Sequence, residues 1–136
     1  MNYLAYTYAE ENIHLEAAET LARRALAVKP KDGYILDTMG WILFKRGDLE
    51  SAVKYLEAAY KANSSESVIV EHLADAYTQK ELIEKAVLLY RKAIELETDT
   101  KKIESLQQKL TSIETMDVKK SRLPASSDKP TAIRKK

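Results

Sequence analysis

Cysteine is absent from this 136-residue sequence, and glycine and proline are scarce, with three of each. Without cysteine the chain forms no disulfides and offers no thiolate ligands to a metal, although this absence says little about the compartment. Few helix-breaking residues, together with abundant Ala, Leu, Glu and Lys, favour helices and argue against a sheet protein. The composition therefore predicts an all-α fold.

Sequence signatures of catalysis and of membrane insertion are also missing. His14 and His72 are the only imidazoles, and there is no HExxH motif, no glycine-rich phosphate loop and no GxSxG motif. Glu71, His72 and Asp75 fall within one helical turn and nominally suit a metal, but ordinary solvated helix surface explains them better. No run of about 18 apolar residues indicates a membrane span. We expect no enzymatic activity, no cofactor, no bound metal and no membrane insertion.

The formal net charge of +1 hides an uneven distribution. Residues 117–136 carry seven Lys or Arg and two Asp, a net charge of +5, so residues 1–116 have a net charge of −4. The segment from 117 onward has too few large apolar side chains to offset the entropy cost of ordering it. We therefore expect a mildly acidic body and a flexible basic tail over 117–136. Because the tail has neither interleaved aromatic residues nor an apolar face, we expect no nucleic-acid binding and no membrane contact.

A repeat of 34 residues organises the rest of the sequence. When the sequence is shifted by 34 residues, Gly40 falls on Ala74 and Ala52 falls on Ala86, and most apolar positions coincide as well. An earlier copy aligns if one extra residue is allowed in the turn before residue 15. Such self-similarity at a fixed period indicates stacked copies of one unit rather than a single closed core.

Helical periodicity and local stop signals divide the repeats into hairpins. Pro30 cannot continue a helix, and Asp32 and Asp48 are suited to cap the helices that follow them. Gly47 suits the left-handed residue that ends a helix. The spacing predicts helices at about 1–10, 15–28, 33–46, 49–62, 66–79 and 82–96.

A seventh, more polar helix is expected at about 99–116, with Ile103, Leu106 and Leu110 on one face. Stacked repeats leave an apolar end exposed unless a helix with one polar face covers it. The alternative is a short dimeric coiled coil along the same seam, which only about two heptads would support. We expect the capping role.

The period, the helical hairpins and the small residues at fixed positions resemble the tetratricopeptide repeat (TPR) family, in particular bacterial arrays. In that family small residues lie where the two helices of a hairpin approach most closely, and Gly40 and Ala74 occupy these positions. The resemblance implies a right-handed α-solenoid of three hairpins, closed by the capping helix. Because Met1 corresponds to the fourth position of the repeat, we expect the chain to be the C-terminal part of a longer array. The resemblance covers about 1–98, with repeats at 1–32, 33–66 and 67–98.

In this family the first helix of each hairpin lines a concave groove that binds a partner polypeptide. Acidic residues outnumber Lys45 at the matching positions, so the resemblance implies an acidic groove that accepts a basic and apolar segment. Trp41 is expected on the groove wall beside Tyr6 and Phe44, and the alternative for Trp41 is packing between adjacent hairpins. The matching positions are Tyr6, Glu10, Tyr34, Asp37, Trp41, Phe44, Lys45, Glu71, Asp75, Thr78 and Gln79.

The function that the resemblance implies is a non-enzymatic scaffold or adaptor for a protein or peptide. The alternative is a self-associating structural module, which stacks through its first hairpin or docks its basic tail in a groove. The sequence leaves the partner and the compartment open. The cytoplasm is expected if this is the full-length product, and the periplasm or a membrane-associated place fits a fragment.

Overall fold

The computed structural model describes residues 2–11 and 14–122, without the side chains of residues 10 and 117–122. Over these residues the chain forms seven helices and no strand. Their bounds are α1 Asn2–Glu10, α2 Leu15–Val28, α3 Gly33–Arg46, α4 Leu49–Ala62, α5 Ser67–Gln79, α6 Ile83–Leu96 and α7 Thr100–Arg122.

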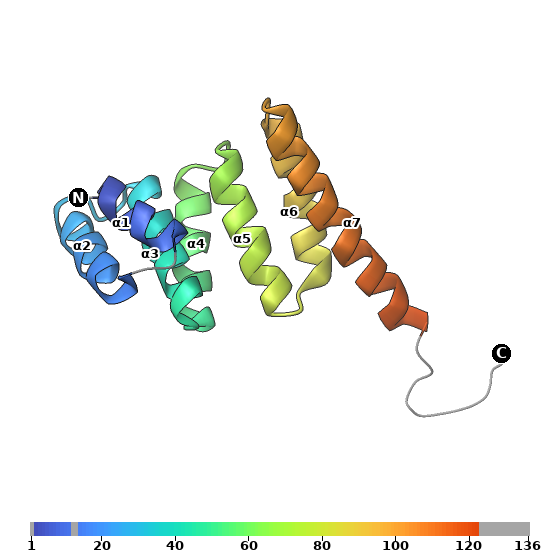
Figure 1. Cartoon of the computed structure of the whole chain (residues 1–136), viewed down its shortest axis with the longest axis horizontal. Helices are drawn as coiled ribbons and strands as arrows, with labels where there is room; N and C mark the ends of the chain where they lie inside the picture. Colours follow the sequence, from blue (N-terminus) through green and yellow to red (C-terminus); the bar gives the residue numbers. More distant parts are fainter. Residues whose placement is uncertain (1, 12–13, 123–136) are drawn as a thin grey trace.

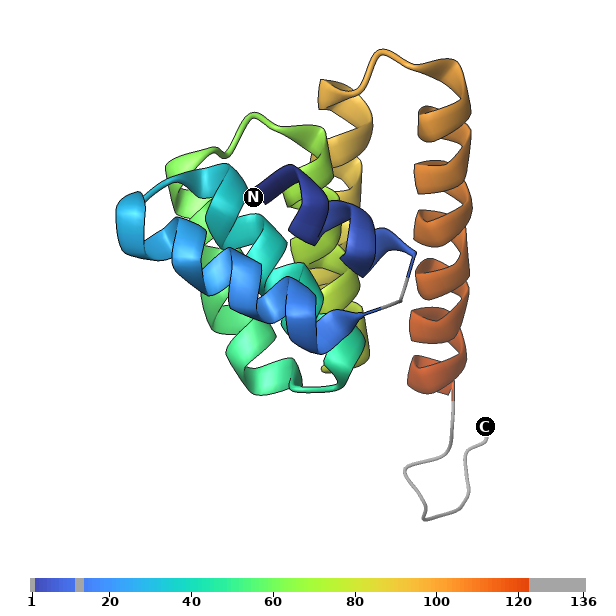
Figure 2. The same ribbon diagram turned by 60° about the vertical axis from the view of Figure 1, so that its left-hand side comes forward.

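The first six helices form three hairpins that follow one another in a row (Figure 1). The second helix of each hairpin packs on the next element, so that α2 contacts α3, α4 contacts α5 and α6 contacts α7. The first helices also contact one another, α1 with α3 and α3 with α5. Figure 2 shows the same stack from the side, with α7 standing beside α6. Contacts between neighbours only are typical of a solenoid, which confirms the predicted all-α solenoid class.

Local signals in the sequence account for the boundaries of the middle hairpin. The Asp32 side chain accepts hydrogen bonds from the backbone N–H groups of Tyr34, at 2.9 Å, and Ile35, at 3.2 Å, and so caps α3. Asp48 caps α4 in the same way. Gly47 ends α3 with a φ of 90°, a left-handed conformation that glycine adopts without steric cost. These are the caps that the sequence predicts.

Small residues lie where the helices of a hairpin approach most closely. A Cβ atom added at Gly40 would lie 2.7 Å from Cγ of Leu56, so no larger residue fits between α3 and α4 without a shift. Ala52, Ala74 and Ala86 are completely buried at the matching contacts. The close approach of the helices within each hairpin therefore depends on the small residues that define the repeat.

Helix α7 is longer than predicted. It runs to Arg122, so the first residues of the expected tail continue the helix, and residues 123–136 lie outside the described part of the chain. Leu106 and Ile113 are buried against the core of the third hairpin, and Leu110 packs on the same core. The expected division at 98 and 116 stays a prediction, but α7 covers the apolar face of α6 as a capping helix would.

Candidate functional site

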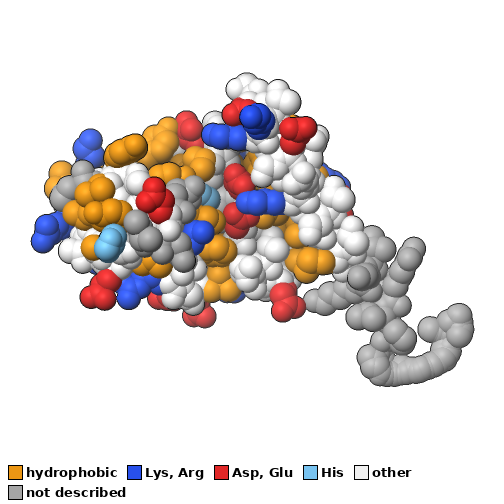
Figure 3. All heavy atoms as spheres, in the orientation of Figure 1, with side chains coloured by type: hydrophobic (Ala, Val, Ile, Leu, Met, Phe, Trp, Pro, Cys, Tyr) orange, Lys and Arg blue, Asp and Glu red, His pale blue; other side chains and the backbone are white. Residues whose placement is uncertain are grey.

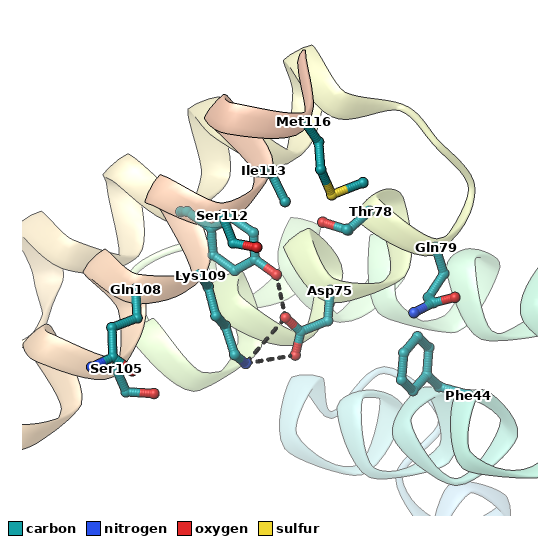
Figure 4. Close-up of a pocket in the computed structure, with 11 residues that line it drawn as sticks. Phe44, Asp75, Thr78, Gln79, Ser105, Gln108, Lys109, Ser112, Ile113 and Met116 are labelled. Atoms are coloured by element: carbon teal, nitrogen blue, oxygen red, sulfur yellow. Dashed lines mark hydrogen bonds and ion pairs between the residues drawn. The ribbon is translucent and has the colours of Figure 1, made fainter. Parts of the chain in front are cut away.

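A groove of about 550 Å³ opens between α3, α5 and α7 (Figure 4). Four predicted site residues line it, namely Phe44 from α3 and Asp75, Thr78 and Gln79 from α5. Phe44 is half-buried and Gln79 is exposed, so the groove offers an aromatic face next to a primary amide. Phe44 of α3 and three residues of α5 thus line one recess, and its identity with the concave groove that the resemblance implies stays a prediction.

Most of the other wall comes from α7, which sequence reasoning treated only as a cap. A signal for this role exists, because Leu106 and Leu110 repeat the spacing of Leu73 and Tyr77 at a shift of 33 residues. Helix α7 thus takes the place of the first helix of a further repeat. It contributes Ser105, Gln108, Lys109, Ser112, Ile113 and Met116 to the groove.

Lys109 connects the two walls of the groove. Its Nζ donates to Oε2 of Glu71 at 2.5 Å and to Oδ2 of Asp75 at 3.1 Å (Figure 4 draws the contact to Asp75). Figure 3 shows acidic and basic side chains next to one another over α5 and α7. The hydroxyl of Tyr90 also donates to Asp75. The groove is therefore less acidic than predicted, since one ammonium partly neutralises two carboxylates.

The ion pairs of Lys109 with Glu71 and Asp75, here called the open bridge, are partly buried, and this burial shifts the pKa values of Asp75 and Lys109. Burial raises the pKa of Asp75, and the attraction of Lys109 and the hydrogen bond from Tyr90 reverse only part of this rise. Burial by itself lowers the pKa of Lys109, but Asp75 and Glu71 more than reverse this, so that the pKa of Lys109 is raised. The ammonium thus stays charged at neutral pH.

Asp37 and His72 form a buried hydrogen-bonded pair between α3 and α5 and do not line the groove. His72 Nδ1 lies 2.9 Å from Oδ1 of Asp37, and both residues are only 4% exposed. Burial by itself lowers the pKa of His72, but the charge of Asp37, its hydrogen bond and the nearby Asp75 and Glu71 raise that pKa above its usual value. The prediction that His72 belongs to solvated surface is wrong, because α3 packs against α5 at this point.

Trp41 also lies deeper than predicted. Its ring is stacked between Phe44, at a centroid distance of 4.8 Å, and His72, at 4.0 Å, and the residue is 7% exposed. Lys45 Nζ lies 5.1 Å from the Trp41 ring centroid. Tyr6 reaches the same cluster, 6.3 Å from the His72 ring. Trp41 therefore packs between adjacent hairpins, which is the alternative that the sequence left open.

Tyr34 and Lys45 do not join the groove. Tyr34 is exposed beside Glu66, near the connection between α4 and α5, because it sits in the first turn of α3. Lys45 covers Trp41 instead of lining the groove. The side chain of Glu10 lies outside the described residues.

The described part of the chain has neither a cluster of metal-ligating side chains nor a candidate membrane span. Residues 2–11 and 14–122 contain no group of three or more His, Asp or Glu side chains placed to hold a metal ion. None of the helices described over this range combines the length and the apolar character needed to cross a bilayer.

Comparisons of sequence show a repeat family. A family model described as tetratricopeptide repeat matches residues 34–66 and 70–100. A TPR repeat-containing protein of Pseudomonas aeruginosa is 39% identical over 59 residues, which make up 43% of this chain and 10% of that protein. The matched segment thus spans about a tenth of the length of this relative.

Solved structures show the same fold at low identity. The TPR domain of Sgt2 from Aspergillus fumigatus superposes with a TM-score of 0.78 at 17% identity, covering 96% of this chain and 83% of that one. The type III secretion translocator chaperone SycD of Yersinia enterocolitica gives a TM-score of 0.75 at 16% identity, covering 85% and 82%. SycD in complex with a peptide of the translocator YopD gives 0.71 at 18% identity, covering 88% and 91%.

These matches agree with the hairpins of the structure and with the 34-residue period of the sequence. The fold that they share is generally a protein–protein interaction module. The chain carries tetratricopeptide repeats over residues 34–66 and 70–100.

Proposed function

We propose that this chain is a non-enzymatic adaptor that binds a segment of a partner polypeptide in the groove between α3, α5 and α7. The observation that carries this proposal is the groove of about 550 Å³, where apolar and hydrogen-bonding side chains lie side by side (Figure 4). Phe44 and Met116 offer apolar contact, and Gln79 and Gln108 offer hydrogen bonds to a backbone. Such a mixture suits a peptide better than a small substrate.

The chemistry of the expected segment follows from the charges in the groove. Glu71 and Asp75 exceed Lys109 by one negative charge, so a partner Lys or Arg is attracted to this wall. Apolar side chains of the partner would contact Phe44 and Met116. We therefore propose a segment that combines basic and apolar residues. A peptide bound to SycD, which has the same fold, supports this mode of recognition.

Peptide selection followed by substitution tests the proposal. Peptides from a random dodecapeptide library would be selected on the wild-type chain, and their affinities measured by fluorescence anisotropy. We expect a basic, apolar class that binds Phe44→Ala about thirtyfold more weakly, because an aromatic anchor commonly contributes about 2 kcal/mol. Val28→Ala, which removes an exposed side chain of α2, is the matched control and is expected to bind normally.

A second substitution separates lost binding from lost folding. Phe44 also packs on the core, so its removal affects stability, whereas Gln79 is exposed. Gln79→Ala is therefore expected to weaken binding without changing the melting temperature. If no selected peptide depends on Phe44, Gln79 or Met116, the groove is not the binding site and the proposal fails.

Self-association is a second candidate, favoured by the exposed apolar side chains of α1. Tyr3 and Leu4 are both exposed on this helix and offer a surface for a second copy. Light scattering after size-exclusion chromatography would then give a mass that rises with concentration and returns to one chain in the double variant Tyr3→Ser/Leu4→Ser. A mass of 15.4 kDa at every concentration of the wild-type chain would exclude this candidate.

A further inference from the structure

A second pocket, of about 360 Å³, opens between α4, α5 and α6 and shares no residue with the groove. Leu73 and Tyr77 of α5 are buried in it, and Leu89 of α6 is half-buried. Leu88, next along α6, is 66% exposed at the same pocket. A single exposed leucine is ordinary, but here it borders a recess whose lining is mainly apolar.

Two lysines flank this pocket without being neutralised. Lys92 Nζ lies 4.7 Å from the Tyr60 ring centroid and donates to the Tyr60 hydroxyl oxygen at 2.7 Å. Lys85 Nζ lies 5.5 Å from the Tyr77 ring centroid. Neither ammonium has an ion-pair partner among the residues that the structure describes. Aromatic rings hold both charges in place, and each charge stays available to an anion.

The one carboxylate that lines the pocket is already engaged. Oε2 of Glu57 accepts a hydrogen bond of 2.5 Å from the Tyr77 hydroxyl. With Lys85 and Lys92 the lining has a net charge of +1, whereas Asp75 and Lys109 leave the lining of the groove with no net charge. The two recesses therefore differ in net charge as well as in position.

We infer that this pocket is a second docking site, for a segment of a partner polypeptide in which Asp or Glu lies close to a large apolar side chain. The apolar side chain enters between Leu73 and Leu88, and the neighbouring carboxylate pairs with Lys92 or Lys85. This inference does not depend on the groove, since α5 presents different residues to the two recesses. An adaptor with both sites would hold two segments of opposite charge at once.

The experiment uses the same dodecapeptide library on the full chain. We expect an enriched class in which Asp or Glu neighbours Leu, Phe or Trp, and anisotropy would measure its affinity. Leu88→Ala and Lys92→Gln are each expected to weaken this class about three- to fivefold, as for one exposed apolar contact or one exposed ion pair. Lys92→Arg, which keeps the charge, is expected to restore binding, and Lys29→Gln, at the exposed residue that follows α2, is the matched control.

Salt and the groove variants complete the test. Raising NaCl from 0.05 M to 0.5 M is expected to weaken this class severalfold, because the lysines are partly exposed. Phe44→Ala and Gln79→Ala are expected to leave this class unaffected, so failure of the groove proposal and failure of this one give different results. The inference is overturned if no acidic, apolar class is enriched, or if its affinity is the same for wild type, Leu88→Ala and Lys92→Gln.

Discussion

Two carboxylates at equivalent positions of successive repeats each pair with a cation on the next first helix. Asp37 of α3 pairs with His72 of α5, and Glu71 of α5, 34 residues later, pairs with Lys109 of α7. The side chains of the first pair are 5% exposed, whereas those of Glu71 and Lys109 are 26% and 38% exposed. Equivalent carboxylates thus make a buried contact in one place and a partly exposed ion pair in the next.

The residue four positions after each carboxylate accounts for the difference. After Asp37 it is Trp41, whose ring stacks on His72 at 4.0 Å and fills the space between α3 and α5. After Glu71 it is Asp75, which is too small to fill the space between α5 and α7, and the groove opens there. One aromatic residue at this position therefore makes the junction between two repeats part of the core, and one short acid leaves the next junction open.

The largest expected effect is the loss of stability when the buried imidazole of His72 is removed. His72→Ala leaves the Asp37 carboxylate buried without its partner and is expected to lower the free energy of unfolding by about 3–5 kcal/mol. Urea unfolding, followed by circular dichroism, measures this loss. Lys109→Ala is the matched variant at the open bridge. Equal losses in the two variants would contradict the comparison.

The second expected effect is a decline of stability with rising pH. The pKa of His72 is raised by Asp37 in the folded chain, so the folded state binds this proton more tightly than the unfolded state does. The stabilisation is therefore complete below about pH 6.5, the usual pKa of histidine, and is lost as the pH rises through the higher pKa of the folded state. Glu71 and Asp75, which act on the same ring, stay in place in the variant used below.

Urea unfolding between pH 6 and pH 9 would measure this decline. The wild-type chain is expected to lose stability over this interval, and His72→Asn, which cannot be protonated there, is expected to lose less. Parallel curves for the two proteins would mean that the His72–Asp37 pair does not depend on the charge of the imidazole.

Much of the fold follows from local sequence signals. The predicted bounds 15–28, 33–46 and 49–62 agree with α2, α3 and α4, because Pro30 and Gly47 stop helices and the aspartates at 32 and 48 start them. Helix α7 ends six residues later than predicted. The prediction ended it at 116 because the composition becomes polar there, but no helix-breaking residue occurs before Pro124. Composition alone underestimates how far a helix continues once its first turns are packed.

The site was predicted less completely. Phe44, Asp75, Thr78 and Gln79 line the recess at positions that the resemblance to the repeat family implies for a groove. The burial of His72 did not follow, because it depends on a contact with a residue 35 positions away and on the size of the ring that covers it. The residues next to His72 in the sequence indicate neither the contact with Asp37 nor the ring of Trp41 that covers it.

A smaller effect is expected at the open bridge. Lys109→Met removes the ammonium from two carboxylates that keep partial access to water, so the free energy of unfolding is expected to fall by about 1 kcal/mol or less. The variant also leaves Glu71 and Asp75 free to meet a partner, and basic peptides selected on the groove are expected to bind it more tightly. Lys101→Met, an exposed control on the same helix, is expected to change neither quantity.

The smallest expected effect is the response of the two pairs to salt. Raising NaCl from 0.1 M to 1 M shortens the screening length from about 10 Å to about 3 Å, which weakens interactions between exposed charges far more than those between buried ones. The stability difference between wild type and Lys109→Met is therefore expected to shrink by a few tenths of a kcal/mol, whereas the difference for His72→Ala is expected to stay constant. General salt effects on burial cancel in these differences. If the two differences shrink alike, water reaches the Asp37–His72 pair, and Trp41 does not close the junction between α3 and α5 in solution.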